Sequence, residues 1–90
     1  MARIIRLAPR YVARLKALRI AHGTERARAI ARTVAALATA TTLPGPLDYL
    51  EAIPPVETAY VRRVVGENLW LYYRFTDDEL ILVTIVDHPP

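Results

Sequence analysis

The last third of the chain restricts the fold most, because residues 60–88 alternate in polarity as β-strands do. The segment Tyr60–Phe75 is interrupted at residues 66–68 by the turn-forming sequence Gly-Glu-Asn. The polar residues 76–79 separate this segment from the apolar run Leu80–Val86. We therefore expect three antiparallel strands joined by two tight turns.

A three-residue loop over residues 66–68 would set the register of the first hairpin, with Val65 facing Leu69. Since successive side chains point to opposite faces, this register predicts one apolar face, on which Arg63 is a misfit. The apolar face would carry Val61, Val65, Leu69, Leu71, Tyr73 and Phe75. The other face would be basic and aromatic, with Tyr60, Arg62, Trp70, Tyr72 and Arg74. We expect this second face to bind a target; a solvated surface with cross-strand aromatic and cation–π pairs is the alternative.

The run Leu80–Val86 is apolar on both faces, which is typical of a strand buried on both sides. We expect it to lie inside the sheet, beside the strand formed by residues 69–75. Its turn, Asp77-Asp78, is a weaker signal than Asp-Gly and leaves the register of this strand open. The face to which His88 belongs is open for the same reason.

A strand and a helix are expected at the N-terminus. The β-branched run Arg3–Leu7 predicts the strand, and Pro9 fits the first turn of a helix. This helix would extend from Arg10 to Ala21, with an apolar stripe toward the core. Gly23 would end it, because glycine adopts the left-handed conformation just past a helix most easily.

A second helix follows, with Thr24 as its N-cap and a 3.6-residue apolar period over residues 25–40. Two helices with so short a connection run antiparallel. The proline- and glycine-rich residues 43–46 would end the second helix. Residues 47–53 would form one further turn before Pro54-Pro55 leads the chain into the sheet.

These elements predict an α+β fold in the order β-α-α-β-β-β: an N-terminal strand, an antiparallel helical hairpin, then a three-stranded antiparallel meander. A chain of this size buries roughly 60% of its unfolded surface, which leaves room for one core. We therefore expect residues 1–90 to form a single domain. No signal peptide or transmembrane run is expected, and the lack of cysteine fits a cytoplasmic protein.

Charge and composition indicate a partner. Residues 1–32 hold nine basic residues against one acidic residue, a local net charge of +8, whereas residues 33–90 have a net charge of −5. Hydrophobic residues make up 53% of the chain, more than so small a core can bury, and another protein would cover the surplus. The basic residues would form a solvated helix surface, or they would attract an acidic protein or nucleic-acid phosphates.

The segment Val61–Phe75, followed by an apolar strand that ends near His88, carries a family resemblance. Together with the order of the elements, it resembles the RelE/ParE superfamily of toxins from bacterial type II toxin–antitoxin systems. Members often show an arginine-bearing strand, a short turn, a strand with a tyrosine followed by an arginine, and a last strand ending near a histidine or arginine.

The resemblance implies a cytoplasmic toxin that inhibits growth, stabilises plasmids and is neutralised by a cognate antitoxin protein. DNA would be contacted only indirectly, through the toxin–antitoxin complex. The basic helical hairpin would contribute the antitoxin-binding residues Arg10, Arg14, Arg28 and Arg32.

Two activities occur in the superfamily. RelE-like members cleave messenger RNA in the ribosome without a metal, and ParE-like members bind DNA gyrase. For cleavage, Arg62 and Arg74 would clamp the phosphate, Tyr72 or His88 would transfer protons, and Trp70 would stack on a base. Trp70 stands where the ribonucleases commonly carry an arginine, and no lysine accompanies the basic pair, which favours gyrase binding slightly.

No cofactor or metal is expected, because the two histidines lack ligand-spaced partners. Serine is absent from the chain, which excludes a serine nucleophile. Two hypotheses therefore remain for this surface. The first is a toxin that acts on gyrase or on ribosome-bound messenger RNA. The second is a non-toxic protein-binding module, or a degenerate toxin, on the same scaffold.

Overall fold

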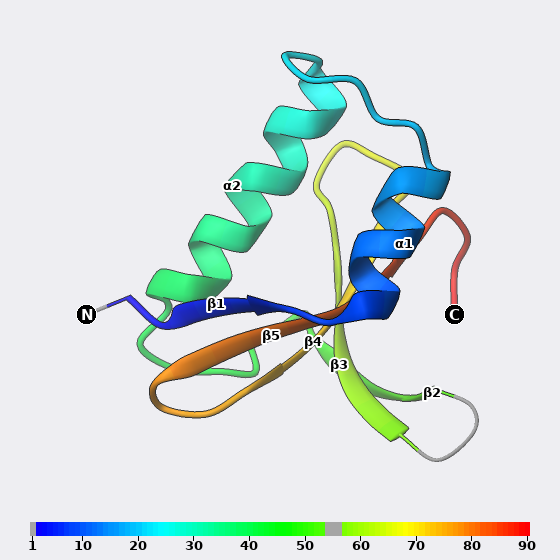
Figure 1. Ribbon diagram of the computed structural model, residues 1–90. Coiled ribbons are helices and arrows are strands. Elements are labelled where there is room, and N and C mark those ends of the chain that lie inside the picture. Colours follow the sequence, from blue (N-terminus) through cyan, green and yellow to red (C-terminus); the bar gives the residue numbers. More distant parts are fainter. Residues whose placement is uncertain (1, 54–56) are drawn as a thin grey trace.

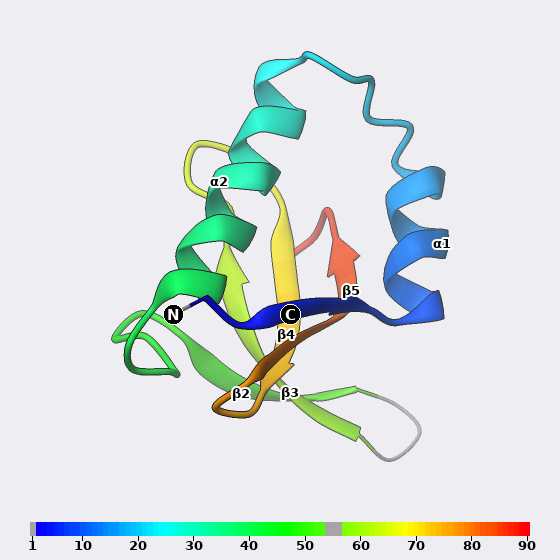
Figure 2. The ribbon, with the colours of Figure 1, turned by 60° about the vertical axis from the view of Figure 1, so that its left-hand side comes forward.

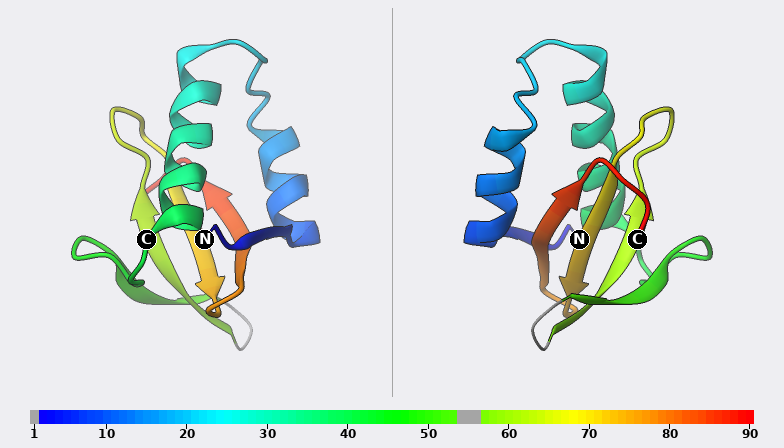
Figure 3. Two further views of the ribbon diagram at one scale, coloured as in Figure 1. Left: turned by 90° about the vertical axis from the view of Figure 1, so that its left-hand side faces the viewer. Right: turned by 90° about the vertical axis from the view of Figure 1, so that its right-hand side faces the viewer.

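Five strands form one sheet, and two helices lie on one of its faces (Figures 1 and 3). The computed structural model describes residues 2–53 and 57–90, so the expected role of Pro54-Pro55 lies outside the described residues. The elements are β1 (Ile4–Leu7), α1 (Pro9–Ala17), α2 (Glu25–Thr39), β2 (Tyr49–Ile53), β3 (Glu57–Arg63), β4 (Trp70–Phe75) and β5 (Glu79–Val86). The α+β class and the terminal meander β3-β4-β5 agree with the prediction.

The sheet has the strand order β1-β5-β4-β3-β2. The interior position predicted for residues 80–86 is confirmed, since β5 pairs with β4 on one side and with β1 on the other. The sheet is mixed and not purely antiparallel, because β1 runs parallel to β5. The expected turn over residues 47–53 is wrong: β2 pairs antiparallel with β3 and occupies the backbone groups that β3 would otherwise leave unpaired at an edge.

The two helices run antiparallel, as predicted, but α1 is shorter than expected (Figure 1). It ends at Ala17 because Arg19 adopts a left-handed conformation, with φ of 54°, and its N–H donates to the carbonyl of Lys16. Gly23 is therefore not the cap of α1. The N-cap of α2 is confirmed, since Thr24 Oγ1 accepts a hydrogen bond from the N–H of Ala27 at 3.2 Å.

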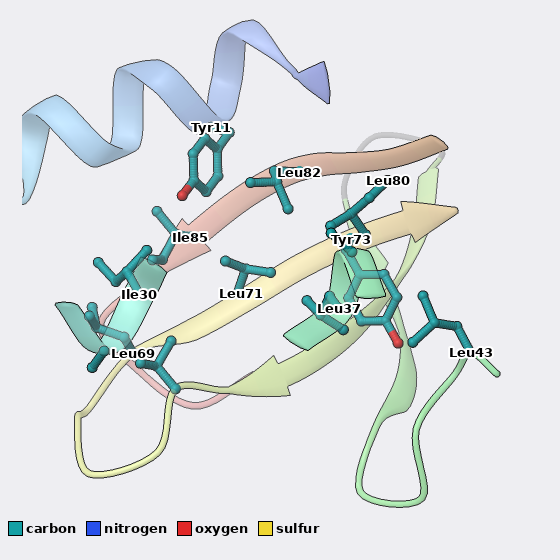
Figure 4. Close-up of a cluster of buried hydrophobic side chains, with 13 residues drawn as sticks. Tyr11, Ile30, Leu37, Leu43, Leu69, Leu71, Tyr73, Leu80, Leu82 and Ile85 are labelled. Atoms are coloured by element: carbon teal, nitrogen blue, oxygen red, sulfur yellow. The ribbon is translucent and has the colours of Figure 1, made fainter. Parts of the chain in front are cut away.

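The main core lies between the helices and the sheet (Figure 4). Leu37 of α2 packs there against Leu71 and Tyr73 of β4, and all three are fully buried. A smaller cluster lies on the other face of the sheet and contains Ile53, Ala59, Val61, Tyr72 and Val83. Among the described residues this second face carries no helix, and we call it the uncovered face (Figure 3).

The register predicted for the β3–β4 hairpin is wrong by one residue. The N–H of Val64 donates to the carbonyl of Leu69 at 2.9 Å, so the loop contains the four residues 65–68. Val64 and Leu69 are both fully buried, and their burial stabilises this pairing in place of the predicted one. Val65, expected in the apolar face, is 85% exposed in the loop.

The corrected register redistributes the residues of β3. Arg63 now pairs with Trp70, Arg62 with Leu71, and Val61 with Tyr72. Tyr60 and Arg62 therefore lie on the helix-covered side, while Val61 and Arg63 lie on the uncovered face. The predicted placement of Tyr60 and Arg62 beside Trp70, Tyr72 and Arg74 is thus wrong, as is the placement of Val61 in the helix-covered core.

Candidate functional site on the uncovered sheet face

The uncovered face is basic and aromatic, but the residues that form it differ in part from those predicted. Trp70, Tyr72 and Arg74 lie on it, as three alternate residues of β4. Arg63 joins them opposite Trp70, and Tyr49 joins them because it pairs with Val61, which in turn pairs with Tyr72. Neither Arg63 nor Tyr49 was predicted for this face, although Arg63 was already the misfit of the expected apolar face.

Arg63 and Trp70 form the best-defined pair on this face. The Arg63 guanidinium carbon lies 5.5 Å from the centroid of the Trp70 ring, within cation–π range. Arg63 also donates from Nε to the carbonyl of Glu67 and from Nη2 to Asn68 Oδ1, both at 3.3 Å. The hairpin loop therefore holds the Arg63 guanidinium in position at the end of the face.

Tyr72 and Arg74 offer binding groups more than catalytic ones. Burial raises the pKa of Tyr72, and Glu51 and Tyr49 add to the shift, so the hydroxyl stays protonated at neutral pH. A group of this kind donates a hydrogen bond but is a poor general base. Arg74 is exposed and lines a cleft of about 450 Å³, whose other lining residues include Ala59 of the uncovered face and Tyr60 and Phe75 of the helix-covered side.

Arg62, predicted as half of a phosphate clamp, forms an ion pair with Asp48 instead. Its Nε and Nη2 donate to the two carboxylate oxygens of Asp48 at 2.7 and 2.8 Å. The Asp48 side chain is fully buried and also accepts hydrogen bonds from the Tyr73 hydroxyl and the Gly45 N–H. Arg62 therefore fastens residues 45–48 to β3 and β4, and the alternation along β3 separates it from Arg74 and Trp70.

The charges of this network stabilise one another. Burial alone would raise the pKa of Asp48, but hydrogen bonds from Arg62, Tyr73 and Gly45 outweigh it and hold that pKa below its usual value. The hydrogen bond to Asp48 likewise raises the pKa of Arg62. Burial and the hydrogen bond to Asp48 raise the pKa of Tyr73. Asp48 thus stays ionised and Tyr73 neutral throughout the physiological pH range.

His88 lies past the end of β5, with 69% of its side chain exposed. Its Nδ1 is 3.5 Å from Asp87 Oδ1, and the same oxygen is 3.9 Å from Nη2 of Arg14 on α1. The structure thus connects His88 to the strand end beside α1. The described contacts do not bring it to Tyr72 or Arg74, with which it was predicted to act.

The two helices stand apart from each other on the sheet (Figure 2). A second candidate surface, an apolar cleft of about 480 Å³, is lined by residues of both helices, of β1 and of β5. We call it the helix groove. Ile5 and Leu7 of β1 line it while remaining 45% and 54% exposed. The other lining residues are Tyr11, Leu15, Ile20, His22, Ala27, Ile30, Ala31, Val34, Ala35 and Leu82. The surplus of hydrophobic residues was the sequence signal for such a surface.

The four arginines predicted to bind an antitoxin lie on the two helices that border this groove. Arg10 and Arg14 belong to α1, and Arg14 Nε donates to the carbonyl of Ile85 at 3.4 Å. Arg28 and Arg32 belong to α2 and pair with Glu25 at 3.3 and 2.6 Å. Solvent screens such exposed pairs strongly, so Arg28 and Arg32 can exchange Glu25 for a carboxylate of a partner protein.

Comparison with known proteins gives no match: neither a protein-family model, nor a curated protein, nor a solved structure is significantly similar to this chain. Within residues 2–53 and 57–90 no cluster of three or more His, Cys, Asp or Glu side chains could hold a metal ion. Neither helix in these residues has the length and apolarity that crossing a membrane requires.

Proposed function

We propose that this chain is a toxin of the RelE/ParE kind from a bacterial type II toxin–antitoxin system, acting in the cytoplasm and neutralised by an antitoxin. The main supporting observation is the open helix groove. Its apolar walls come from β1 and both helices, in the part of the chain with a net charge of +8. An acidic antitoxin segment would cover this apolar surface and balance the positive charge of the residues around it. The topology, with a meander following the helical hairpin, supports the same proposal.

The uncovered face favours a toxin that binds its target over one that cleaves RNA. Arg62 is occupied by Asp48, the one contact described for His88 is with Asp87 and not with the uncovered face, and the raised pKa of Tyr72 makes its hydroxyl a poor base. Arg63, Trp70 and Arg74 still provide cations and an aromatic ring for a target surface. We therefore favour DNA gyrase as target, with ribosome-dependent cleavage of messenger RNA as the second possibility.

A non-toxic binding module, or a degenerate toxin, is the alternative function. The observation that favours it is the same loss of the predicted catalytic set, because a binding protein needs no general base. In this alternative the helix groove and the uncovered face hold a partner without harm to the cell.

Growth of a bacterial culture after induction of the chain tests these functions. The double variant Arg63→Ala/Arg74→Ala removes the two cations of the uncovered face. The matched control, Arg28→Ala/Arg32→Ala, removes two exposed arginines from α2 and should leave the activity unchanged in the absence of an antitoxin. We expect arrest by the wild type and the control but not by the face variant, with thymidine uptake falling before methionine uptake.

Other outcomes would contradict parts of the proposal. Unimpaired growth with folded wild-type protein would favour the non-toxic module. Arrest by all three proteins would keep the toxin and remove the uncovered face as its site. An earlier fall in methionine uptake than in thymidine uptake would indicate translation as the target.

A further inference from the structure

Two loops project from the same side of the molecule (Figure 3). A third cleft, separate from the helix groove, is lined by residues of both loops. One is the segment 44–48 that precedes β2, and the other is the hairpin loop 65–68. The cleft has a volume of about 430 Å³, within the range of ligand-binding sites. It is lined by Pro46, Leu47, Tyr49, Arg62, Arg63, Val65 and Gly66. We call it the loop cleft.

The apolar walls of the loop cleft are unusually exposed. Leu47 is 88% exposed and Val65 is 85% exposed, while Tyr49 is 43% exposed. These three side chains come from two different loops and a strand end. They form one patch because all three line the same cleft. Exposed apolar patches beside polar groups are typical of surfaces that dock a partner.

Both loops are fastened to the body of the protein. Asp48 holds the first loop through Arg62, Tyr73 and the Gly45 N–H. The second loop is held by the Val64–Leu69 backbone bond and by the ion pair of Glu67 with Arg26 of α2, at 3.3 Å. A surface held in this way loses little conformational entropy when it binds.

The charges around the loop cleft indicate which kind of ligand it would bind. The charge of Arg62 is balanced by Asp48, and the carboxylate of Glu67 is paired with Arg26. None of the ion pairs found among the described residues involves Arg63, whose guanidinium is held by Trp70, Asn68 and a backbone carbonyl. The cleft therefore presents one positioned cation beside an apolar hollow.

We propose that the loop cleft binds an acidic peptide segment of a partner protein, with one apolar side chain in the hollow and an adjacent carboxylate on Arg63. A nucleic-acid strand fits less well, since its repeated phosphates need several cations and Arg63 alone is unbalanced here. The inference does not rest on the proposed function, because a toxin and a non-toxic module would carry the same cleft.

The test is to pan a phage-displayed random heptapeptide library on the immobilised full chain. Counter-selection on Leu47→Ser/Val65→Ser removes peptides that bind elsewhere. This variant should fold normally because both positions are almost fully exposed, and circular dichroism and thermal unfolding check that it does. An enriched peptide is then synthesised and titrated into the ¹⁵N-labelled chain.

We expect enriched peptides to carry Asp or Glu within two positions of Leu, Ile or Phe and to shift the amide signals of residues 47–49 and 63–66. Affinity should fall about tenfold or more in Leu47→Ser/Val65→Ser and in Arg63→Gln. Matched controls are Leu50→Ser and Arg19→Gln, which make the same chemical changes at exposed positions outside the cleft and should leave the affinity unchanged.

Three results would overturn the proposal. The first is a library from which nothing is enriched over the counter-selection. The second is enrichment of peptides without a carboxylate, or of peptides whose affinity is insensitive to Arg63→Gln. The third is a labelled oligouridine that shifts the same amide signals at lower concentration than the peptide, which would assign the cleft to RNA.

Discussion

A shift of one residue in the register of the β3–β4 hairpin exchanges the surroundings of Arg62 and Arg63. The two arginines are neighbours in the chain, yet one is bound to a buried carboxylate on the helix-covered side and the other lies on the uncovered face. Alternation along β3 places the two arginines on opposite faces of the sheet, and the length of the hairpin loop decides which arginine lies on which face. The sequence contains a clue, since Arg63 did not fit the apolar face of the three-residue loop. Its preference for a polar surface outweighs the turn statistics that favoured that loop.

The Asp48 network predicts a large effect for a small change. Asp48→Asn removes the charge that balances Arg62 and disturbs an arrangement in which the carboxylate accepts four hydrogen bonds from three residues. We expect a loss of about 2–3 kcal/mol in the free energy of unfolding, because Arg62 would keep a half-buried charge without a partner. Urea unfolding measures this loss. Asp77→Asn, in an exposed turn, is the control and should change stability little.

The same carboxylate makes stability depend on pH in the acid range. The pKa of Asp48 is lowered in the folded state, so the unfolded chain binds its proton first as the pH falls. This contribution is fully present above the ordinary aspartate pKa of about 4 and is lost below it. We expect the free energy of unfolding to decline from about pH 4 downward, less steeply in Asp48→Asn. Equal slopes for both proteins would contradict this assignment.

Gly45 is required by the network for steric reasons. A Cβ at this position would overlap Nη2 of Arg62, which is held by both oxygens of Asp48. Gly45→Ala should therefore cost about 1–2 kcal/mol of unfolding free energy. In an Arg62→Ala background the same substitution should cost much less, and a double-mutant cycle measures the difference. An equal cost in both backgrounds would remove Arg62 as the cause.

At the level of elements, periodicity was sufficient for α2 and for the three strands of the meander. It failed for β2, whose five residues are bordered by turn-forming sequences and become a strand only because β3 offers an edge. It also failed for the end of α1, where the left-handed residue just past the helix is Arg19 and not Gly23, whose own positive φ of 77° comes later in the connection. Both failures have one origin: tertiary contacts override local preferences in short segments.

The N-cap of α2 is a local feature with a predictable energy. Thr24 Oγ1 accepts from the Ala27 N–H and donates to the carbonyl of Ala21 at 2.8 Å. Thr24→Ala should lower the free energy of unfolding by about 1 kcal/mol, and Thr24→Asp should restore most of it. Thr39→Ala, at the exposed end of the same helix, is the control. If Thr24→Asp is as unstable as Thr24→Ala, the cap does not act as described.

At the scale of the whole molecule, the parts of the candidate site that could be predicted were those set by alternation within one strand. Trp70, Tyr72 and Arg74 share a face whatever the register. Whether Arg62, Arg63 and Tyr49 lie on that face depends on how the strands pair. The helix groove depends on how α1 and α2 are spaced. These relations arise from packing across the chain, so periodicity carries no information about them.

The exposed edge of β1 leads to a prediction for the isolated protein. β1 is an edge strand, and its residues Ile4, Ile5 and Leu7 are 66%, 45% and 54% exposed; Ile5 and Leu7 also line the helix groove. Its charged residue, Arg6, is paired with Glu79 and offers little protection of the edge. Without a partner, the chain should therefore self-associate as its concentration rises, through β1 and the adjoining groove.

Ile5→Lys tests this expectation. A lysine on an edge strand opposes pairing with another strand, and its charge would also lie in the apolar groove. Sedimentation velocity should show a shift toward monomer, with the free energy of unfolding changed by less than about 1 kcal/mol. Leu50→Lys makes the same kind of change at β2, the opposite edge of the sheet, and should leave association through β1 intact. If Leu50→Lys rather than Ile5→Lys yields monomer, association occurs at the β2 edge. The exposed apolar surface of β1 would then be tolerated without a partner, which would weaken the case for an antitoxin in the helix groove.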